Sequence, residues 1–119
     1  MPFQYILANL LAETGAVGVL FLDETGETVD VSCSEFTPDE MRIVGAYLGI
    51  YLRQLASFLQ NHRAGIPELI HIEKEKLHIY ATPLPDDYYL VLVQRPPAVV
   101  AHARRCLVRA AKELERALF

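Results

Sequence analysis

The segment from Thr37 to Asn61 constrains the fold of this chain more than any other part of its sequence. Thr37 is followed by Pro38 and, three positions on, by Glu40. A threonine that accepts from the amide three residues later, with a glutamate that reaches back, starts a helix, and proline fits the first turn. Apolar residues then recur with a helical period. The sequence therefore predicts a long helix that runs to about Asn61.

This helix carries more apolar surface than one sheet can cover. At 100° per residue, one apolar stripe contains Met41, Val44, Leu48, Leu52, Leu55 and Leu59. A second sector beside it contains Ile43, Tyr47, Ile50, Tyr51 and Phe58. A helix this apolar is normally covered on two sides. A loop or a terminus could cover the second sector, but we favour the same helix of a second subunit, related by a two-fold axis.

Length and composition indicate one folded domain over residues 1–119. The chain has 119 residues, of which 52% are hydrophobic and 22% are charged. The sequence contains no run of about 18 uncharged apolar residues, which a membrane-spanning helix would need. Residues 1–11 lack the basic start of a secretory signal. Two cysteines, Cys33 and Cys106, are too few for a disulfide framework. We therefore expect reduced thiols, a cytoplasmic location and no membrane contact.

The other segments alternate between helix and strand patterns. We expect helices over 5–13 and 98–118, and strands over 16–22, 27–33, 68–73, 76–84 and 88–94. Gly15 suits a helix end, and Asp23-Glu24-Thr25-Gly26 suits a tight turn. The predicted order is α-β-β-α-β-β-β-α, and its short connections favour antiparallel neighbours.

Finer assignments follow from the same patterns. In the 27–33 strand, the alternation places Val29, Val31 and Cys33 on one apolar side. A two-residue turn at Lys74-Glu75 would place Ile72 opposite Leu77, Ile70 opposite Ile79 and His71 opposite His78. The expected apolar stripe of the last helix contains Val99, Val100, Ala103, Leu107, Ala110, Leu114 and Leu118.

Three segments carry a resemblance to a known family. In its order of elements and in these three segments, the chain resembles the Roadblock/dynein light chain family. The segments are Asp23-Glu24-Thr25-Gly26 after a buried strand, Thr37-Pro38-Asp39-Glu40 at a helix start, and Pro85-Asp86-Asp87-Tyr88-Tyr89 before the last strand. The resemblance covers roughly residues 5–118. It implies an α+β, profilin-like fold: a five-stranded antiparallel sheet with one helix on one face and the two terminal helices on the other.

The resemblance also implies an assembly and a function. In the family's dimer, second helices pack together and third strands join edge to edge, which makes residues 66–73 the outer strand here. Bacterial members typically bind and regulate Ras-like GTPases, and eukaryotic relatives serve as scaffold subunits. We therefore expect a homodimeric interaction module that regulates or scaffolds a small Ras-like GTPase.

Two other functions remain open from the sequence. A small-molecule-binding sensory domain can share this arrangement of sheet and helices, and a scaffold subunit could have no GTPase partner at all. An interior cavity lined by small residues would favour a sensor. The predicted interior is bulky, and the residues concerned are Leu10, Leu20, Phe21, Leu90 and Leu92. This bulk favours a filled core and an interaction module.

The expected binding residues lie mostly on the long helix. The predicted dimer interface consists of Ile43, Tyr47, Ile50, Tyr51, Gln54, Phe58, Leu69 and His71. The predicted partner-binding strip consists of Arg42, Ala46, Arg53, Ser57 and Gln60. Arginine and tyrosine are common anchors of protein interfaces because they combine contact area with directed hydrogen bonds.

The sequence predicts no enzyme, cofactor or metal site. The glycines form neither a GxGxxG nor a GxxxxGK[ST] motif. His71 and His78 would supply only half of a zinc site, and His62 and His102 are isolated. Cys33 and Cys106 fall beside apolar stripes, which is typical of small buried side chains rather than activated thiolates.

Charge is distributed unevenly along the chain. Residues 95–119 carry a net charge of +4, whereas the preceding residues carry −8, and the whole chain is at −4. This balance predicts no general affinity for nucleic acid. Arg105, Arg109, Lys112 and Arg116 form a stripe on the last helix. A solvated face is the simplest interpretation; docking on an acidic partner or on an anionic membrane is the alternative.

Overall fold

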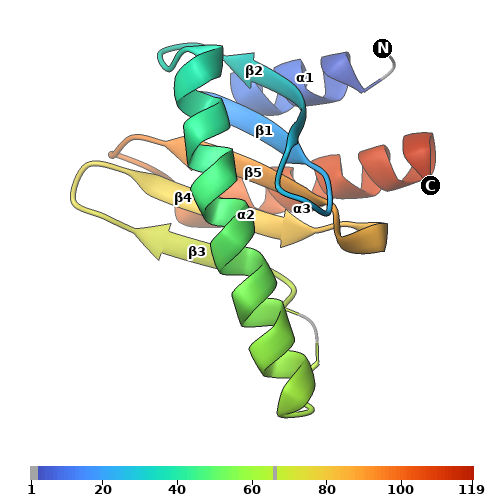
Figure 1. The fold of residues 1–119 in the computed structure, drawn as a ribbon. Helices are drawn as coiled ribbons and strands as arrows, with labels where there is room; N and C mark the ends of the chain where they lie inside the picture. Colours follow the sequence, from blue (N-terminus) through green and yellow to red (C-terminus); the bar gives the residue numbers. More distant parts are fainter. Residues whose placement is uncertain (1–2, 66) are drawn as a thin grey trace.

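The chain folds into one five-stranded antiparallel sheet with helices on both faces (Figure 1). The computed structural model describes residues 3–65 and 67–119. In chain order the elements are α1 (Gln4–Thr14), β1 (Gly18–Leu22), β2 (Thr28–Cys33), α2 (Pro38–Asn61), β3 (Ile70–Glu73), β4 (His78–Pro83), a 3-10 turn (Pro85–Asp87), β5 (Tyr89–Gln94) and α3 (Val100–Leu118). The strand order is β2-β1-β5-β4-β3, so β3 lies at an edge.

Helix α2 crosses one face of the sheet, and α1 and α3 cover the other (Figure 1). On the α1 and α3 face, the core contains Ile6, Leu7, Leu10, Val19, Phe21, Tyr80, Leu90, Leu92, Leu107 and Leu114. On the α2 face, it contains Leu20, Leu22, Met41, Leu48, Leu52, Val91 and Val93. The predicted element order and layer arrangement are confirmed. The five bulky residues expected inside are at most 2% exposed, so the core around them is filled.

Local signals start and end the elements where the sequence indicates. Thr37 and Glu40 form a complete capping box, in which the Thr37 hydroxyl accepts from the Glu40 amide at 3.1 Å and the Glu40 carboxylate accepts from the Thr37 amide at 2.9 Å. Gly15 ends α1 in the left-handed conformation at φ 64°. In the β1–β2 turn, Asp23 accepts from Thr25 and Glu27. These hydrogen bonds, led by the Thr25 hydroxyl, lower the pKa of Asp23.

The predicted register of the β3–β4 hairpin is wrong. Ile72 lies opposite Ile79, Ile70 opposite Ala81, and His71 opposite Tyr80. Lys74 donates its amide to the Leu77 carbonyl at 2.8 Å, so Glu75 and Lys76 form the tip of the hairpin, one position later than the predicted turn. Neither Lys-Glu nor Glu-Lys is a preferred hairpin-turn pair, so local turn chemistry does not set the register here. The shift is two residues, which preserves the faces: the aliphatic side chains of the hairpin still share one side of the sheet.

Two further assignments need correction. Phe21 lies opposite Asp30 but Leu22 lies opposite Thr28, so Val29 is the extra residue of a bulge and is exposed rather than part of the apolar side. In α3, Val99 precedes the helix and Leu118 ends it, and both are exposed.

The remaining differences concern the buried face of α3 and the strand bounds. Cys106 and Ala111 are buried, because α3 packs on α1 as well as on the sheet and its buried face is therefore wider. The strands begin at residues 18, 28, 70, 78 and 89, each slightly after the predicted start. Residue 66 of the predicted outer strand lies outside the described residues.

Candidate functional site

The second apolar sector of α2 is exposed. Its five side chains, Ile43, Tyr47, Ile50, Tyr51 and Phe58, are between 49% and 75% exposed. By contrast, Met41, Leu48 and Leu52 of the first stripe are buried against the sheet. No described loop or terminus covers the sector, so the loop alternative weighed from the sequence is wrong for the described residues. Scattered exposed apolar residues are ordinary, but a continuous apolar face on one helix marks a binding surface.

This exposed sector continues onto the β3–β4 hairpin as a groove. The groove holds about 370 Å³ and is lined by Ile43, Val44, Tyr47, Leu48, Tyr51, Ile72 and Ile79. Two aliphatic side chains of the hairpin therefore extend the apolar surface of α2 across the sheet. The surface is bounded by the edge strand β3, whose outer side has no neighbouring strand among residues 3–65 and 67–119.

The predicted partner-binding strip lies beside this sector on α2. Its members, Arg42, Ala46, Arg53, Ser57 and Gln60, are all exposed. Arg42 pairs with Asp39 one turn earlier, at 2.8 Å. Arg53 donates from Nε to the Gly49 carbonyl at 3.4 Å, a bond that does not use its terminal nitrogens. The strip therefore presents two arginines. Arg42 is held by a neighbouring carboxylate, and Arg53 retains N–H donors that could bind a partner.

The remaining predicted interface residues lie on two different faces. Gln54 is exposed on α2 within the apolar sector. Leu69 and His71 belong to the β3 edge, but their side chains lie on the α1 and α3 face. The His71 ring stacks on the Tyr80 ring at 4.5 Å and contacts His78, with Nε2 of His71 2.9 Å from Nδ1 of His78. Burial, followed by the charge of His78, lowers the pKa of His71.

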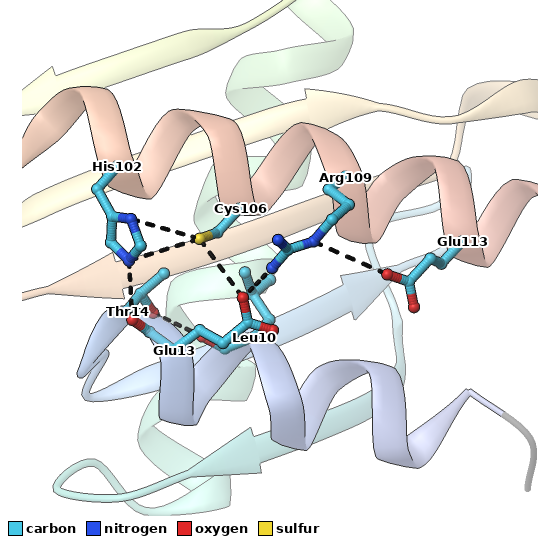
Figure 2. Close-up of polar contacts among 7 residues, drawn as sticks. All are labelled: Leu10, Glu13, Thr14, His102, Cys106, Arg109 and Glu113. Atoms are coloured by element: carbon cyan, nitrogen blue, oxygen red, sulfur yellow. Dashed lines mark hydrogen bonds and ion pairs between the residues drawn. The ribbon is translucent and has the colours of Figure 1, made fainter.

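A polar cluster between α1 and α3 was not predicted from the sequence (Figure 2). The Cys106 thiol donates to a Glu13 carboxylate oxygen at 3.7 Å and lies 3.6 Å from Nε2 of His102. Arg109 pairs with the same carboxylate. The sequence indicates an isolated His102 because Glu13 is 89 residues away in the chain, and no local sequence pattern relates residues at that separation.

The cluster joins two helices. Cys106 is buried, and its hydrogen is directed at Glu13. His102 places Nε2 3.0 Å from the Glu13 carbonyl oxygen. The thiol, the imidazole and the guanidinium of Arg109 therefore all hold the end of α1 against α3. Within the described residues, no group of three histidine, cysteine, aspartate or glutamate side chains is arranged to hold a metal ion.

Comparisons at the level of sequence give no match, either to a protein-family model or to a curated protein. Comparison with solved structures does give matches. An MglB with a tetrameric arrangement superposes with a TM-score of 0.87 at 19% identity, covering 97% of this chain and 86% of that chain. Myxococcus xanthus MglB gives 0.86 at 16% identity, with coverages of 98% and 97%. A Roadblock/LC7 domain from Streptomyces avermitilis gives 0.84 at 13% identity, with coverages of 96% and 95%.

The chain has the Roadblock/LC7 fold. The match extends over nearly all of the chain and of each of these proteins, so it includes the sheet and all three helices. The fold implied by the sequence resemblance is thereby confirmed. None of the helices in the described parts of this Roadblock/LC7 fold is long and apolar enough to cross a membrane.

Proposed function

We propose that this protein is a homodimeric interaction module that binds a small Ras-like GTPase and regulates or positions it. The exposed apolar face of α2 carries this proposal. Each fully buried side chain of this kind is worth roughly 1.5–3 kcal/mol relative to exposure, so leaving five of them in water is unfavourable. A second copy of the same helix, antiparallel across a two-fold axis, presents a matching apolar face.

The open edge of β3 supports the same dimer. An exposed edge strand is an aggregation hazard unless it is covered, bulged or paired. Strand β3 is continuous with the apolar groove through Ile72, so one partner subunit could cover both the groove and the edge. One structural neighbour is an MglB with a tetrameric arrangement, which supports self-association of this chain.

The partner surface would be the strip of α2 that the dimer leaves uncovered. Arg53, Ser57 and Gln60 lie along one side of the apolar sector on α2. A rigid helix suits this role, since a flexible loop would add an ordering cost to binding. The two MglB neighbours support a regulator of this type, and the resemblance of the sequence to bacterial Roadblock proteins supplies the class of partner.

The filled interior favours this function over a small-molecule sensor. Phe21 and the four leucines expected inside occupy the space on both sides of the central strands. The grooves lined by α2 and by α3 open at the surface of the protein. We infer that the protein acts by binding macromolecules and has no catalytic activity of its own. We place it in the cytoplasm, because both cysteines are free.

Sedimentation of the unmodified protein tests the dimer directly. We expect a dimer at micromolar concentration, and we expect Ile50→Asp to yield a folded monomer. Ile50 is 49% exposed and packs outside both cores, so the substitution removes the interface without opening the interior. Tyr5→Asp is the matched control, because Tyr5 is 60% exposed on α1 and lies away from α2. A monomeric unmodified protein would contradict the proposal.

A further inference from the structure

A second groove lies on the opposite face of the sheet from α2. It has a volume of about 780 Å³ and runs between the exposed side of α3 and the residues that lead into β3. Its floor and rim include the apolar side chains Leu69 and Val108, and four cationic side chains line it: Arg104, Arg105, Arg109 and Lys112. We propose that this groove binds an acidic segment of a partner protein, independently of the surface on α2.

Three of the four cations that line the groove form no ion pair with the described carboxylates. All four are exposed. Arg109 pairs with Glu13 and Glu113 across and along the helices (Figure 2). Arg104, Arg105 and Lys112 form no ion pair with any described carboxylate. Glu68 is the one acidic residue among the described side chains that line the groove. The groove is thus a concentrated positive site on a chain whose net charge is −4.

This charge pattern selects the kind of ligand. An acidic ligand gains attraction within the groove and is repelled by the acidic remainder of the chain, which fixes where it binds. Arginine guanidinium groups hold carboxylates through paired hydrogen bonds, so Arg104 and Arg105 suit aspartate or glutamate side chains. Leu69 is half-buried and Val108 is 38% exposed, so the groove also offers contact to an aliphatic side chain.

The shape of the site favours a peptide over the other anionic partners. A bilayer presents a broad surface, whereas these cations line a concave groove between a helix and a strand end. Nucleic-acid binding depends on several phosphate contacts along a stripe of cations. Three unpaired cations on a chain with a net negative charge supply few such contacts. A short acidic segment with an aliphatic anchor matches both the charge and the apolar lining.

Fluorescence anisotropy with a labelled peptide of about twelve residues, two repeats of Gly-Glu-Glu-Leu-Glu-Glu, tests the proposal. We expect saturable binding that weakens steeply with salt, because exposed charges are screened beyond about 10 Å at 0.1 M. Arg105→Glu/Lys112→Glu should weaken binding at least about tenfold, which corresponds to about 1.4 kcal/mol. Arg42→Glu/Arg53→Glu is the matched control: it changes the net charge equally on the opposite face and should leave the affinity within about twofold.

Three further comparisons make the test decisive. A peptide with serine in place of each leucine has the same charge and should bind more weakly, because it cannot use Leu69 and Val108. Equal binding of both peptides, or equal loss in both variants, would mean attraction by net charge alone and would overturn the proposal. Binding to phosphatidylserine vesicles or single-stranded DNA that depends on Arg105 and Lys112, with no binding of the leucine peptide, would overturn it as well.

Discussion

Gly49 of α2 lies against Gly26 of the β1–β2 turn, so closely that a Cβ on Gly49 would be 2.8 Å from the Gly26 Cα. Gly26 itself has φ 86°, which favours glycine. The helix backbone therefore packs directly on the turn backbone. Gly45, one turn earlier, similarly approaches the methyl groups of Leu20 and Leu22. These contacts seat one side of α2 on β1 and leave the apolar sector and the polar strip outside.

Gly49→Ala should therefore destabilise the protein, although alanine is the better helix former. The propensity gain is about 1 kcal/mol, but the added methyl group meets backbone that cannot move aside as a side chain could. Overpacking of this kind typically costs 1–3 kcal/mol, so we expect a net loss in the free energy of unfolding, measured by urea denaturation. Ser57→Ala on the exposed strip is the control and should leave stability unchanged or slightly raised.

The edge of β3 should be protected from exchange in the intact protein. If β3 pairs with its symmetry mate, amides along residues 69–72 that point away from β4 acquire partners. Hydrogen exchange followed by mass spectrometry should then show slow exchange there. In the Ile50→Asp monomer the same amides should exchange rapidly, while the paired amides of β1 stay protected. Solvent-rate exchange at 69–72 in the unmodified protein would contradict edge pairing.

Arg53→Glu should weaken binding of the GTPase partner about tenfold or more, or about 1.4 kcal/mol, without splitting the dimer. Arg53 is exposed on the strip, and its only described contact is a hydrogen bond within the helix to the Gly49 carbonyl. Joint charge reversal of Arg109 and Lys112 on α3 is the comparison and should have little effect. Titration of the partner at fixed salt, with sedimentation of each variant, measures both properties. The opposite ranking would move the docking site to α3.

Stability should fall as the pH drops through about 6.5, the ordinary pKa of histidine. Burial and the nearby His78 lower the pKa of His71 in the folded state. Between the lowered folded value and 6.5, the unfolded chain binds more protons than the folded chain, so acid favours unfolding. The contribution is complete above 6.5 and is lost as the pH approaches the folded pKa.

Urea denaturation between about pH 5.5 and 7.5 measures this effect. His71→Gln should flatten the pH dependence, whereas Ser57→Ala, which is exposed on α2 and changes no titratable group, should leave it as in the unmodified protein. If His71→Gln and the unmodified protein follow the same curve, the lowered pKa of His71 does not control the acid response.

Local features of the fold could be predicted from the sequence because they depend on neighbouring residues. The capping box at Thr37 and Glu40, the left-handed Gly15 and the two apolar sectors of α2 each arise within a few turns of chain. The exposure of the second sector was predictable for the same reason: the helical period alone separates Tyr47 and Ile50 from Leu48 and Leu52.

Tertiary structure decided the contacts between residues that are distant in the chain. The β3–β4 register, the bulge at Val29 and the contact of Cys106 with Glu13 depend on how elements pack, and neither alternation nor spacing reports this. The groove on α3 is of the same kind. The basic stripe was visible in the sequence, but Leu69 meets it only because the sheet order places β3 at the edge beside β4. Periodicity determines which side of an element is apolar, whereas packing determines what that side faces.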